Sequence, residues 1–435
     1  MSLKTPNKIR DLKNKLYRKA KDEPECRFHQ LYDKVYREDI LSHAYALAKA
    51  NKGAPGVDGE SFEDIELKGL DGWLTGLGKD LREKTYQPQP VRRKMIPKRG
   101  GGERPLGIPT IRDRVAQTAA KLILDPIWEA DLEPNAYAYR AGKSAQGAIG
   151  EVDKLLYKGY TNIVDADLSK YFDTIPHSEL MQCVARRIVD RQMLHLIKMW
   201  LTVPVEERDE KGNRKLTGGK GNDRGTPQGG VVSPGLANLY MNRMLKGWRQ
   251  TGRTAQFQAH IVNYADDFVI ACRGNAEAAL EWTRGVLGRL GLTLNEKKTS
   301  IRDAGKERFD FLGYSFGPHF SRRTGREYIG ASPSAKSMSQ IKEAVSDLLD
   351  RRNVEPWEEV QRKLNQNLTG WRNYFSLGAT SLAYHNVDEY VYDRVRNFLR
   401  RRHKVSSQGT RQFSGFHVYG ELGVVRLQGP WYPSS

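Results

Sequence analysis

The sequence predicts an α+β protein whose mixed body is followed by a helical C-terminal domain. Two apolar, strand-like segments, residues 162–172 and 260–272, stand among helical segments in the middle of the chain. After Pro333 the apolar spacing becomes helical and remains so to about Lys404. At 435 residues the chain is long enough for two or three domains with a substantial shared core.

The composition is that of a folded, strongly basic protein. Hydrophobic residues make up 38% and aromatic residues 9%, which is typical of a folded rather than a disordered chain. The net charge of +19 and the pI of 9.6 indicate a polyanionic partner, most commonly nucleic acid. A basic protein that is merely soluble is the alternative that charge alone leaves open.

The cysteines Cys26, Cys183 and Cys272 form neither a disulfide framework nor a CxxC zinc pattern, so a reducing cytoplasm is expected. The nine histidines show no HExxH motif and no Cys/His cluster, so a catalytic metal would take oxygen ligands, as Mg²⁺ or Mn²⁺ does. Residues 1–25 lack an apolar core and predict neither a secretory signal nor a typical transit peptide. No stretch is long and apolar enough to predict a membrane span.

The first ninety residues are expected to be mainly helical. Ile9, Leu12 and Leu16 have helical spacing in a basic opening segment. A second helical run, residues 40–50, ends at a loop rich in Gly, Pro and Asp, residues 51–61.

The next segments alternate between strands and helices. Residues 91–110 predict two short strands around a turn at 99–103, with basic residues near its tip. A helical pattern from Ile111 to Ala130 continues past Pro126.

The middle of the chain has a different character. The buried strand at 162–172 leads into a turn, and Pro176 can open the helix that follows. Residues 211–219 predict an exposed hairpin, and residues 260–272 predict two apolar strands on either side of an Asp-Asp pair.

The C-terminal third predicts a helical domain and a short tail. The tail after Lys404 is rich in glycine and predicts short strands at best. Two apolar stripes have helical spacing: Met338, Ile341, Val345 and Leu348 in the first, and Trp357, Val360, Leu364, Leu368, Trp371 and Phe375 in the second.

Three aspartates stand at the ends of the predicted central strands. Asp167 ends one strand, and a tight turn would bring Asp266 and Asp267 to the same edge of the sheet. Each feature alone is usually a turn or a cap. Together they fit phosphoryl transfer onto a 3′-hydroxyl, which uses two cations about 4 Å apart held by carboxylates from rigid elements.

The surrounding motifs resemble a known family in their order. The motifs are DLSKYFDTI (167–175), GTPQGGVVSPGLANLYMN (225–242), YADD (264–267), LGLTLNEKKT (290–299) and FLGYSF (311–316). They are similar to the successive palm motifs of reverse transcriptases, and residues 40–404 resemble a group II intron-encoded reverse transcriptase, or maturase. Residues 96–117 resemble the fingers of that family, and LTGWRNYF (368–375) resembles its maturase, or thumb, domain.

The resemblance implies a right-hand polymerase with antiparallel sheet in fingers and palm, followed by an α-helical thumb. No Cys/His cluster follows the thumb, so a type without the endonuclease of many relatives is expected. The implied domains are an N-terminal helical extension with the start of the fingers (1–90), fingers (91–160), palm (161–332), helical thumb/maturase domain (333–404) and a short tail (405–435).

By the same resemblance, Asp167, Asp266 and Asp267 would hold two Mg²⁺ or Mn²⁺ ions. Asp165 and Asp173 flank the first of them and are interpreted as structural. Lys298 stands where a lysine could protonate the leaving pyrophosphate, although the adjacent Lys297 leaves that role open.

The expected contacts to the incoming deoxynucleoside triphosphate come from several motifs. Lys98 and Arg104 would grip the phosphates, and Gln228 would line the nucleotide pocket. Phe172 would act as a gate against the ribose 2′-hydroxyl, with core packing as the alternative. Residues 136–146 depart from the usual SxGFRxxR-like form, which leaves the detail of a template contact open.

A basic helix near the C-terminus predicts RNA binding. Its apolar residues Val391, Val395, Phe398 and Leu399 have helical spacing, so one face can dock while the cations face outward. A solvated charged face is the alternative. The predicted RNA-binding residues are Arg394, Arg396, Arg400, Arg401, Arg402 and Lys404.

The resemblance implies an RNA-directed DNA polymerase that uses an RNA template, a DNA primer and deoxynucleoside triphosphates. It further implies binding to a structured group II intron RNA, assistance to its splicing, and mobility into target DNA. The alternatives are an RNA-binding splicing cofactor with a vestigial polymerase and a relative recruited to phage defence or spacer acquisition. The retained aspartates and basic fingers argue against the vestigial site, because mutually repelling carboxylates are stable together mainly with metal bound.

Overall fold

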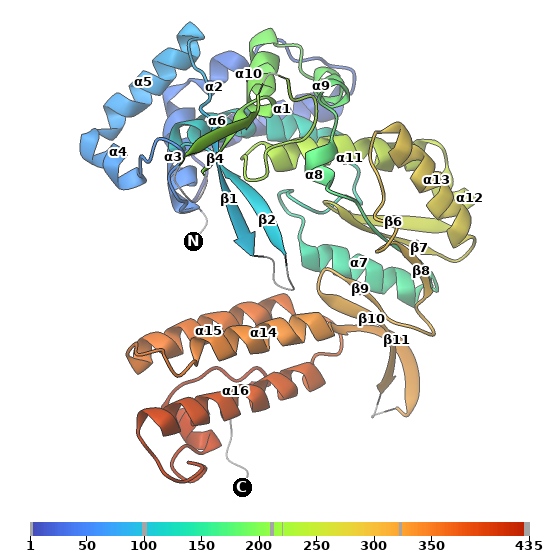
Figure 1. Ribbon diagram of the computed structural model, residues 1–435. Coiled ribbons are helices and arrows are strands. Elements are labelled where there is room, and N and C mark those ends of the chain that lie inside the picture. Colours follow the sequence, from blue (N-terminus) through green and yellow to red (C-terminus); the bar gives the residue numbers. More distant parts are fainter. Residues whose placement is uncertain (1–2, 98–101, 209–212, 220, 322–323, 430–435) are drawn as a thin grey trace.

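The computed structural model describes residues 3–97, 102–208, 213–219, 221–321 and 324–429. In Figure 1 an upper lobe of helices and a small sheet is joined to a central sheet, and a separate group of helices lies below. Within the described residues, no helix combines the length and the apolar surface that crossing a bilayer requires.

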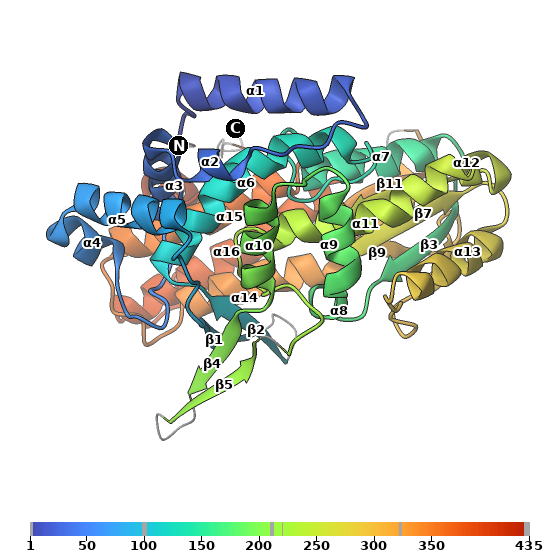
Figure 2. The same ribbon diagram turned by 90° about the horizontal axis from the view of Figure 1, so that it is seen from above.

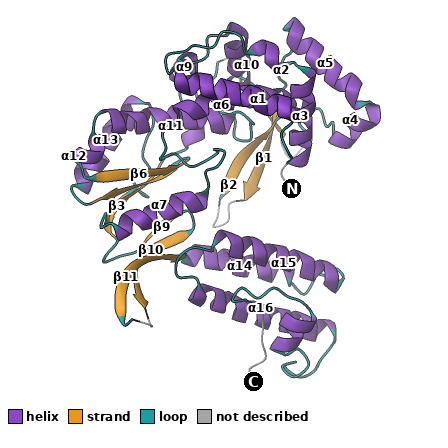
Figure 3. Ribbon diagram, turned by 180° about the vertical axis from the view of Figure 1, so that it is seen from behind, coloured by secondary structure: helices purple, strands orange, loops and turns teal. Residues whose placement is uncertain are grey.

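The N-terminal helices cover the upper lobe. Helix α1 (Asn7–Asp22) runs along the long helix α6 (Ile111–Asp131), as Figure 3 shows from behind. It buries Ile9, Leu16 and Ala20 against the core. Pro126 lies inside α6 without ending it, as predicted. The other helices of this part are α2 (Tyr32–Val35), α3 (Glu38–Ala50), α4 (Phe62–Lys68) and α5 (Leu70–Glu83).

The small sheet of the upper lobe has the strand order β2-β1-β4-β5 (Figure 2). Strands β1 (Val91–Pro97) and β2 (Glu103–Ile108) form the predicted hairpin, and β4 (Pro204–Arg208) and β5 (Arg214–Gly218) form a second one. The sheet is antiparallel within each hairpin, as expected, and β1 and β4 join the two hairpins in parallel. Along the chain β4 follows a strand of the central sheet, so the two sheets are interleaved in the sequence.

The central sheet is antiparallel throughout, with the order β6-β7-β3-β8. Helices cover both of its faces, so its strands are nearly continuously apolar. Ile163 faces the cluster around helix α7, whereas Val164 and Ala166 face the cluster around α11 and α13. The strands are β3 (Asn162–Asp167), β6 (Ala259–Tyr264), β7 (Asp267–Cys272) and β8 (Ser300–Asp303), and the covering helices are α7 (Ala145–Tyr157), α11 (Ser233–Gln250) and α13 (Ala276–Arg289).

Shorter elements complete the body. Pro176 precedes α9, as predicted. These elements are the helices α8 (Tyr171–Thr174), α9 (His177–Ala185), α10 (Arg191–Leu201) and α12 (Arg253–Gln256), and the sheet of β9 (Phe309–Phe311), β10 (Tyr314–Ser321) and β11 (Arg326–Pro333).

The lower lobe has its own apolar core between α14 (Ala335–Leu348), α15 (Trp357–Tyr374) and α16 (Ser381–Arg402). Both predicted stripes supply this core. The described part of the tail contains no strand; a π-helical turn, His417–Glu421, takes the place of the short strands that were expected. The buried carboxylate of Asp388 accepts hydrogen bonds from the backbone N–H groups of Leu427 and Gln428 and thereby ties the tail to α16.

Candidate active site

The register of the central sheet brings the predicted metal-binding aspartates together. Asp167 on β3 stands directly opposite Asp267 on β7, and Tyr264 pairs with Asp267 across the β6–β7 hairpin. Only Ala265 and Asp266 therefore remain in the turn, and Ala265 has a φ of 58°. A positive φ is uncommon for alanine and is characteristic of tight two-residue hairpins. The turn thus holds both YADD carboxylates at one edge of the sheet.

Buried Asn263 braces this turn from inside. Its side-chain amide donates to the carbonyl oxygen of Ala265 over 2.9 Å, and its backbone N–H donates to the carbonyl oxygen of Asn135 over 3.0 Å. The strained turn is consequently fixed to the loop that follows α6.

The carboxylates affect one another strongly. Burial raises the pKa of Asp267 well above its ordinary range, and the negative charges of Asp266 and Asp167 raise it further. Burial is also the main cause of the raised pKa of Asp266. Such a site favours a bound proton or a bound cation over three bare charges.

A lysine and an asparagine contact Asp167. The Nζ of Lys298 lies 2.9 Å from Oδ2 of Asp167, and Nδ2 of Asn295 donates to the same oxygen over 3.2 Å. The Asp167 contact raises the pKa of Lys298, so its ammonium keeps its proton. The structure thus distinguishes Lys298 from Lys297. Asn295 had no role in the sequence-based prediction.

The donor chemistry of the three aspartates fits a hard divalent cation, because all three supply only oxygen ligands. Among the described residues, no group of three or more His, Cys, Asp or Glu side chains is arranged so that it could hold a metal ion in these positions. Lys298 supplies positive charge beside Asp167.

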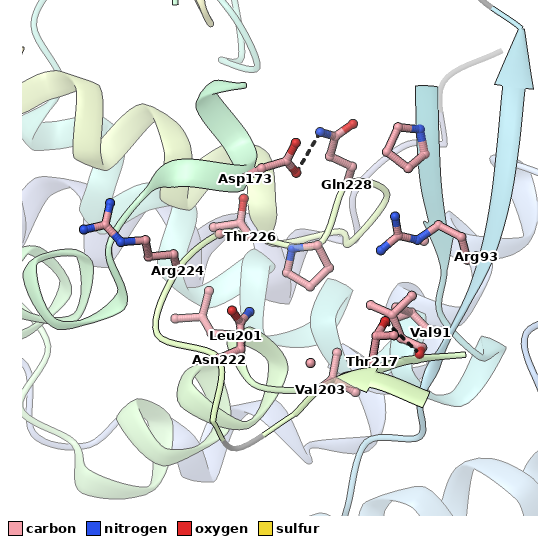
Figure 4. Close-up of a pocket in the computed structure, with 16 residues that line it drawn as sticks. Val91, Arg93, Asp173, Leu201, Val203, Thr217, Asn222, Arg224, Thr226 and Gln228 are labelled. Atoms are coloured by element: carbon pink, nitrogen blue, oxygen red, sulfur yellow. Dashed lines mark hydrogen bonds between the residues drawn. The ribbon is translucent and has the colours of Figure 1, made fainter. Parts of the chain in front are cut away.

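A polar bridge links the fingers sheet to the central body. Arg104 on β2 donates through Nε to Oε1 of Gln228 over 3.1 Å. Gln228 in turn donates through Nε2 to Oδ1 of Asp173 over 3.0 Å (Figure 4). The structure therefore brings two predicted nucleotide contacts together and links one of them, Gln228, to Asp173. Lys98, the other predicted phosphate contact, lies outside the described residues.

A glycine permits the close approach at this bridge. The backbone N–H of Gly107 donates to the carbonyl oxygen of Gln228 over 2.6 Å. Gly229 follows with a φ of 108°, and a Cβ at that position would overlap the carbonyl oxygen of Gly107. Glycine is required there both for the backbone angle and for the space.

A cavity of about 340 Å³ lies beside this bridge (Figure 4). Arg93 and Arg224 lie on opposite sides of it, and Val91 and Leu201 contribute to its apolar lining. Asp167, Asp266 and Asp267 do not line it, so this cavity is separate from the edge of the sheet that carries these three aspartates.

The predicted sugar gate, Phe172, is only 8% exposed. Its carbonyl oxygen accepts a hydrogen bond from the N–H of Thr226, and its ring makes an edge contact with Tyr139, with centroids 6.5 Å apart. Phe172 therefore lies at the site and also packs in the core. Tyr139 was not among the predicted site residues, and a tyrosine carries no sequence signal for the left-handed backbone that it adopts here.

The FLGYSF motif joins the body to the helical lobe. Ser337 on α14 donates through Oγ to the carbonyl oxygen of Gly313 over 2.8 Å, and Tyr374 donates to that of Leu312 over 2.9 Å. Phe316, the last residue of the motif, stacks on Phe309, with ring centroids 5.2 Å apart. Aromatic packing under this turn agrees with the prediction.

The six predicted RNA-binding cations do not form one outward face. Arg394 donates to the carbonyl oxygen of Ser346, Arg396 pairs with Asp393, and both arginines are half-buried. Arg400 is half-buried too, and its NH1 group lies 3.5 Å from the carbonyl oxygen of Ser407.

The C-terminal members of the set are exposed. Arg402 donates to the carbonyl oxygens of Val354 and Glu355, so it also joins α16 to the loop before α15. Arg401 and Lys404 are exposed. Only Arg401, Arg402 and Lys404 are therefore exposed, as expected for all six. Arg394 and Arg400 contact neighbouring segments, and Arg396 pairs with Asp393 on α16 itself.

Comparison with known proteins places these features in families. The reverse transcriptase (RNA-dependent DNA polymerase) family matches residues 96–316, and the group II intron, maturase-specific domain matches residues 338–413. The chain is 34% identical over 366 residues to protein YkfC of Escherichia coli (strain K12). The aligned region covers 76% of this chain and 93% of YkfC.

A second relative is the group II intron-encoded protein LtrA of Lactococcus lactis subsp. cremoris. It is 27% identical over 355 residues, a match that covers 66% of this chain and 56% of LtrA. The chain thus spans nearly all of YkfC but only a little over half of LtrA. Among solved structures, telomerase from Candida albicans in complex with a fragment of telomeric RNA aligns with a TM-score of 0.44 at 15% identity, over 81% of this chain and 69% of that one.

Proposed function

Because the chain belongs to the reverse transcriptase family and carries a group II intron maturase-specific domain, we propose that it copies RNA into DNA and binds a group II intron RNA. The observation that carries the polymerase proposal is the pairing of Asp167 with Asp267 beside the tight YADD turn. That register gathers oxygen ligands on rigid strands, which is what a nucleotidyl-transfer site needs.

In this proposal Asp167, Asp266 and Asp267 hold Mg²⁺ or Mn²⁺, two ions in all. When bound, such ions activate the attacking 3′-hydroxyl and stabilise the charge on the leaving pyrophosphate. Burial and mutual repulsion raise the pKa of Asp266 and Asp267, which supports the proposal because added positive charge relieves both costs.

The other side chains bind and orient the substrates. Arg104 is proposed to present its guanidinium to the triphosphate, and Gln228 orients that group by accepting a hydrogen bond from its Nε. Lys298 carries a proton on Nζ beside Asp167 and is proposed as the acid that protonates pyrophosphate. Phe172 is proposed to exclude a ribose 2′-hydroxyl.

The RNA partner is proposed from the C-terminal lobe. Exposed Arg401, Arg402 and Lys404 can contact RNA phosphates, and the matched maturase-specific domain contains all three. Help with intron splicing, mobility into target DNA and a cytoplasmic location are parts of the same proposal.

Primer extension tests the proposed polymerase directly. Asp267→Asn should abolish most Mg²⁺-dependent extension of a DNA primer on an RNA template, because a charge that acts on the metal is worth several kcal/mol. Asp310→Asn is the matched control, since Asp310 is exposed on β9 and is not one of the proposed metal ligands. A folded Asp267→Asn protein that extends primers at the wild-type rate would remove the metal-site assignment.

A splicing cofactor with an idle polymerase is the second candidate. It requires intron RNA binding by a wild-type protein that extends no primer with either Mg²⁺ or Mn²⁺. Measuring intron RNA binding on the same preparations therefore separates the two candidates.

A further inference from the structure

Tyr139 is an exposed aromatic residue held in an unfavourable backbone conformation. It lies in the loop between α6 and α7, with a φ of 57° and 51% of its surface exposed. A non-glycine residue in the left-handed region costs roughly 1–2 kcal/mol, and it persists only where the surroundings fix it. Strain of this kind is often found at functional sites.

Two sets of hydrogen bonds fix this loop. Arg140, which follows Tyr139, makes a bidentate ion pair with Glu129, and its NH1 group donates to two carbonyl oxygens of its own loop over 2.6 and 2.7 Å. Buried Asn238 on α11 donates to the carbonyl oxygen of Ala138 over 2.6 Å. Arg140 is therefore a structural residue that holds Tyr139 in place.

The loop is also fastened to the YADD hairpin. The backbone N–H of Tyr137 donates to the carbonyl oxygen of Asn263 over 2.9 Å, and Asn263 supports the turn at Ala265. Tyr139 therefore has a fixed position relative to the catalytic carboxylates.

The side chain of Tyr139 lies among the proposed nucleotide contacts. Its ring meets the ring of Phe172 edge-on, with an interplanar angle of 82°. Burial raises the pKa of Tyr139, the charge of Asp266 raises it further, and the charge of Arg104 opposes this effect. The ring therefore contacts the proposed sugar gate directly, and the charges of a proposed metal ligand and of a proposed phosphate contact act on its hydroxyl.

Phe172 alone offers little surface to a substrate. It is 8% exposed, and Ala265, the small residue of the turn, is buried. Tyr139 is 51% exposed, so most of the accessible surface of this pair of rings belongs to Tyr139.

We propose that Tyr139 forms the outer wall of the nucleotide pocket and holds Phe172 in the position that discriminates deoxyribose from ribose. It is a positioning residue, and this inference rests on the proposed polymerase function. The ring carries the effect, and the hydroxyl is dispensable.

Three variants separate the ring from the backbone. Tyr139→Phe keeps the ring, whereas Tyr139→Gly removes the ring and adopts the same φ without strain. Tyr157→Ala is the control, because Tyr157 is 93% exposed on α7. For each protein, the unfolding midpoint is measured together with kcat and KM for single additions of a deoxynucleotide and of the matching ribonucleotide.

Tyr139→Phe and Tyr157→Ala should behave like the wild type. Tyr139→Gly should raise the KM for deoxynucleotide and lower the preference for deoxynucleotide over ribonucleotide, roughly three- to tenfold, as expected for loss of an aromatic edge contact. Combining Tyr139→Gly with Phe172→Ala should lower the preference little further than Phe172→Ala alone, because the two rings act as a unit.

Three outcomes would overturn the inference. A folded Tyr139→Gly protein with wild-type KM and preference would show that the ring only covers the loop. Additive effects of Tyr139→Gly and Phe172→Ala would show that the two rings act independently. A wild-type protein that extends no primer would overturn the proposed polymerase function, and this inference would fall with it.

Discussion

Replacement of Gly229 by alanine tests whether the fingers must contact the central body closely for nucleotide binding. Gly229 has a φ of 108°, and a Cβ there would overlap the carbonyl oxygen of Gly107. Holding a non-glycine residue in such a region costs about 1–3 kcal/mol. Displacing the loop would also weaken the 2.6 Å hydrogen bond from Gly107 to Gln228, worth about 0.5–1.5 kcal/mol.

The expected total is thus roughly 2–4 kcal/mol. This cost lowers the unfolding midpoint by several degrees. Because the overlap is with a backbone oxygen, the loop must also shift, so Gln228 loses its position between Arg104 and Asp173 and the KM for deoxynucleotide rises. Thermal unfolding and single-nucleotide extension are measured on the same preparations, so both effects are detected.

Two neighbouring glycines provide a graded comparison. Gly221→Ala should be silent, because a Cβ there meets nothing within 4 Å. Gly230→Ala should be intermediate, because its Cβ would lie 2.7 Å from Oγ of Ser233, a side chain rather than backbone. A Gly229→Ala protein with unchanged midpoint and unchanged KM would refute the requirement for this close approach.

The remaining predictions concern other parts of the molecule. Phe172→Ala should raise ribonucleotide incorporation relative to deoxynucleotide, and an unchanged ratio in an active protein would assign the gate elsewhere. Mg²⁺ should raise the unfolding midpoint of the wild type. Asp267→Asn should raise the midpoint measured without metal, because one repelling carboxylate is gone, and it should reduce the increase that Mg²⁺ causes, because one proposed ligand is gone. For the double variant Arg401→Ala and Lys404→Ala, the logarithm of the intron RNA binding constant should fall less steeply with the logarithm of the salt concentration. The slope should decrease by roughly 0.7–0.9 for each phosphate that the protein no longer neutralises, while a short preannealed primer–template is extended normally. Asp388→Ala should lower the free energy of unfolding by about 1–3 kcal/mol for each backbone N–H left unpaired, and it should make the tail sensitive to limited proteolysis. A tail as resistant as that of the wild type would contradict this prediction.

The central sheet and its aspartates could be predicted because their signal is local. Apolar strands that end at Asp167 and at the YADD turn determine the sheet edge, and the order of the motifs identifies the family. The thumb core could also be predicted, since helical periodicity alone places Val345 and Leu364 inside.

The cross-chain contacts could not be predicted in this way. Periodicity says nothing of which strand pairs with β1, so the parallel partner β4 was missed. Spacing on α16 separates apolar from polar positions, but it does not show that Arg394 reaches the carbonyl oxygen of Ser346 on α14. The roles of Asn295 and Tyr139 depend on residues more than thirty positions away in the chain, Asp167 and Phe172.

The parallel pairing of β1 with β4 has a consequence for how the chain folds. Val91 meets Val205 only after the intervening segment, with the whole of β3, has been synthesised. The two sheets are therefore interleaved along the chain, and their pairings join residues that are far apart in sequence. Such an arrangement has a high contact order, because long loops must close, with a loss of conformational entropy, before the stabilising contacts can form. The C-terminal lobe, by contrast, draws its core from α14 and the residues after it. We expect this lobe to fold as a local unit, whereas a nascent chain that ends near residue 160 lacks the strands needed to close either sheet.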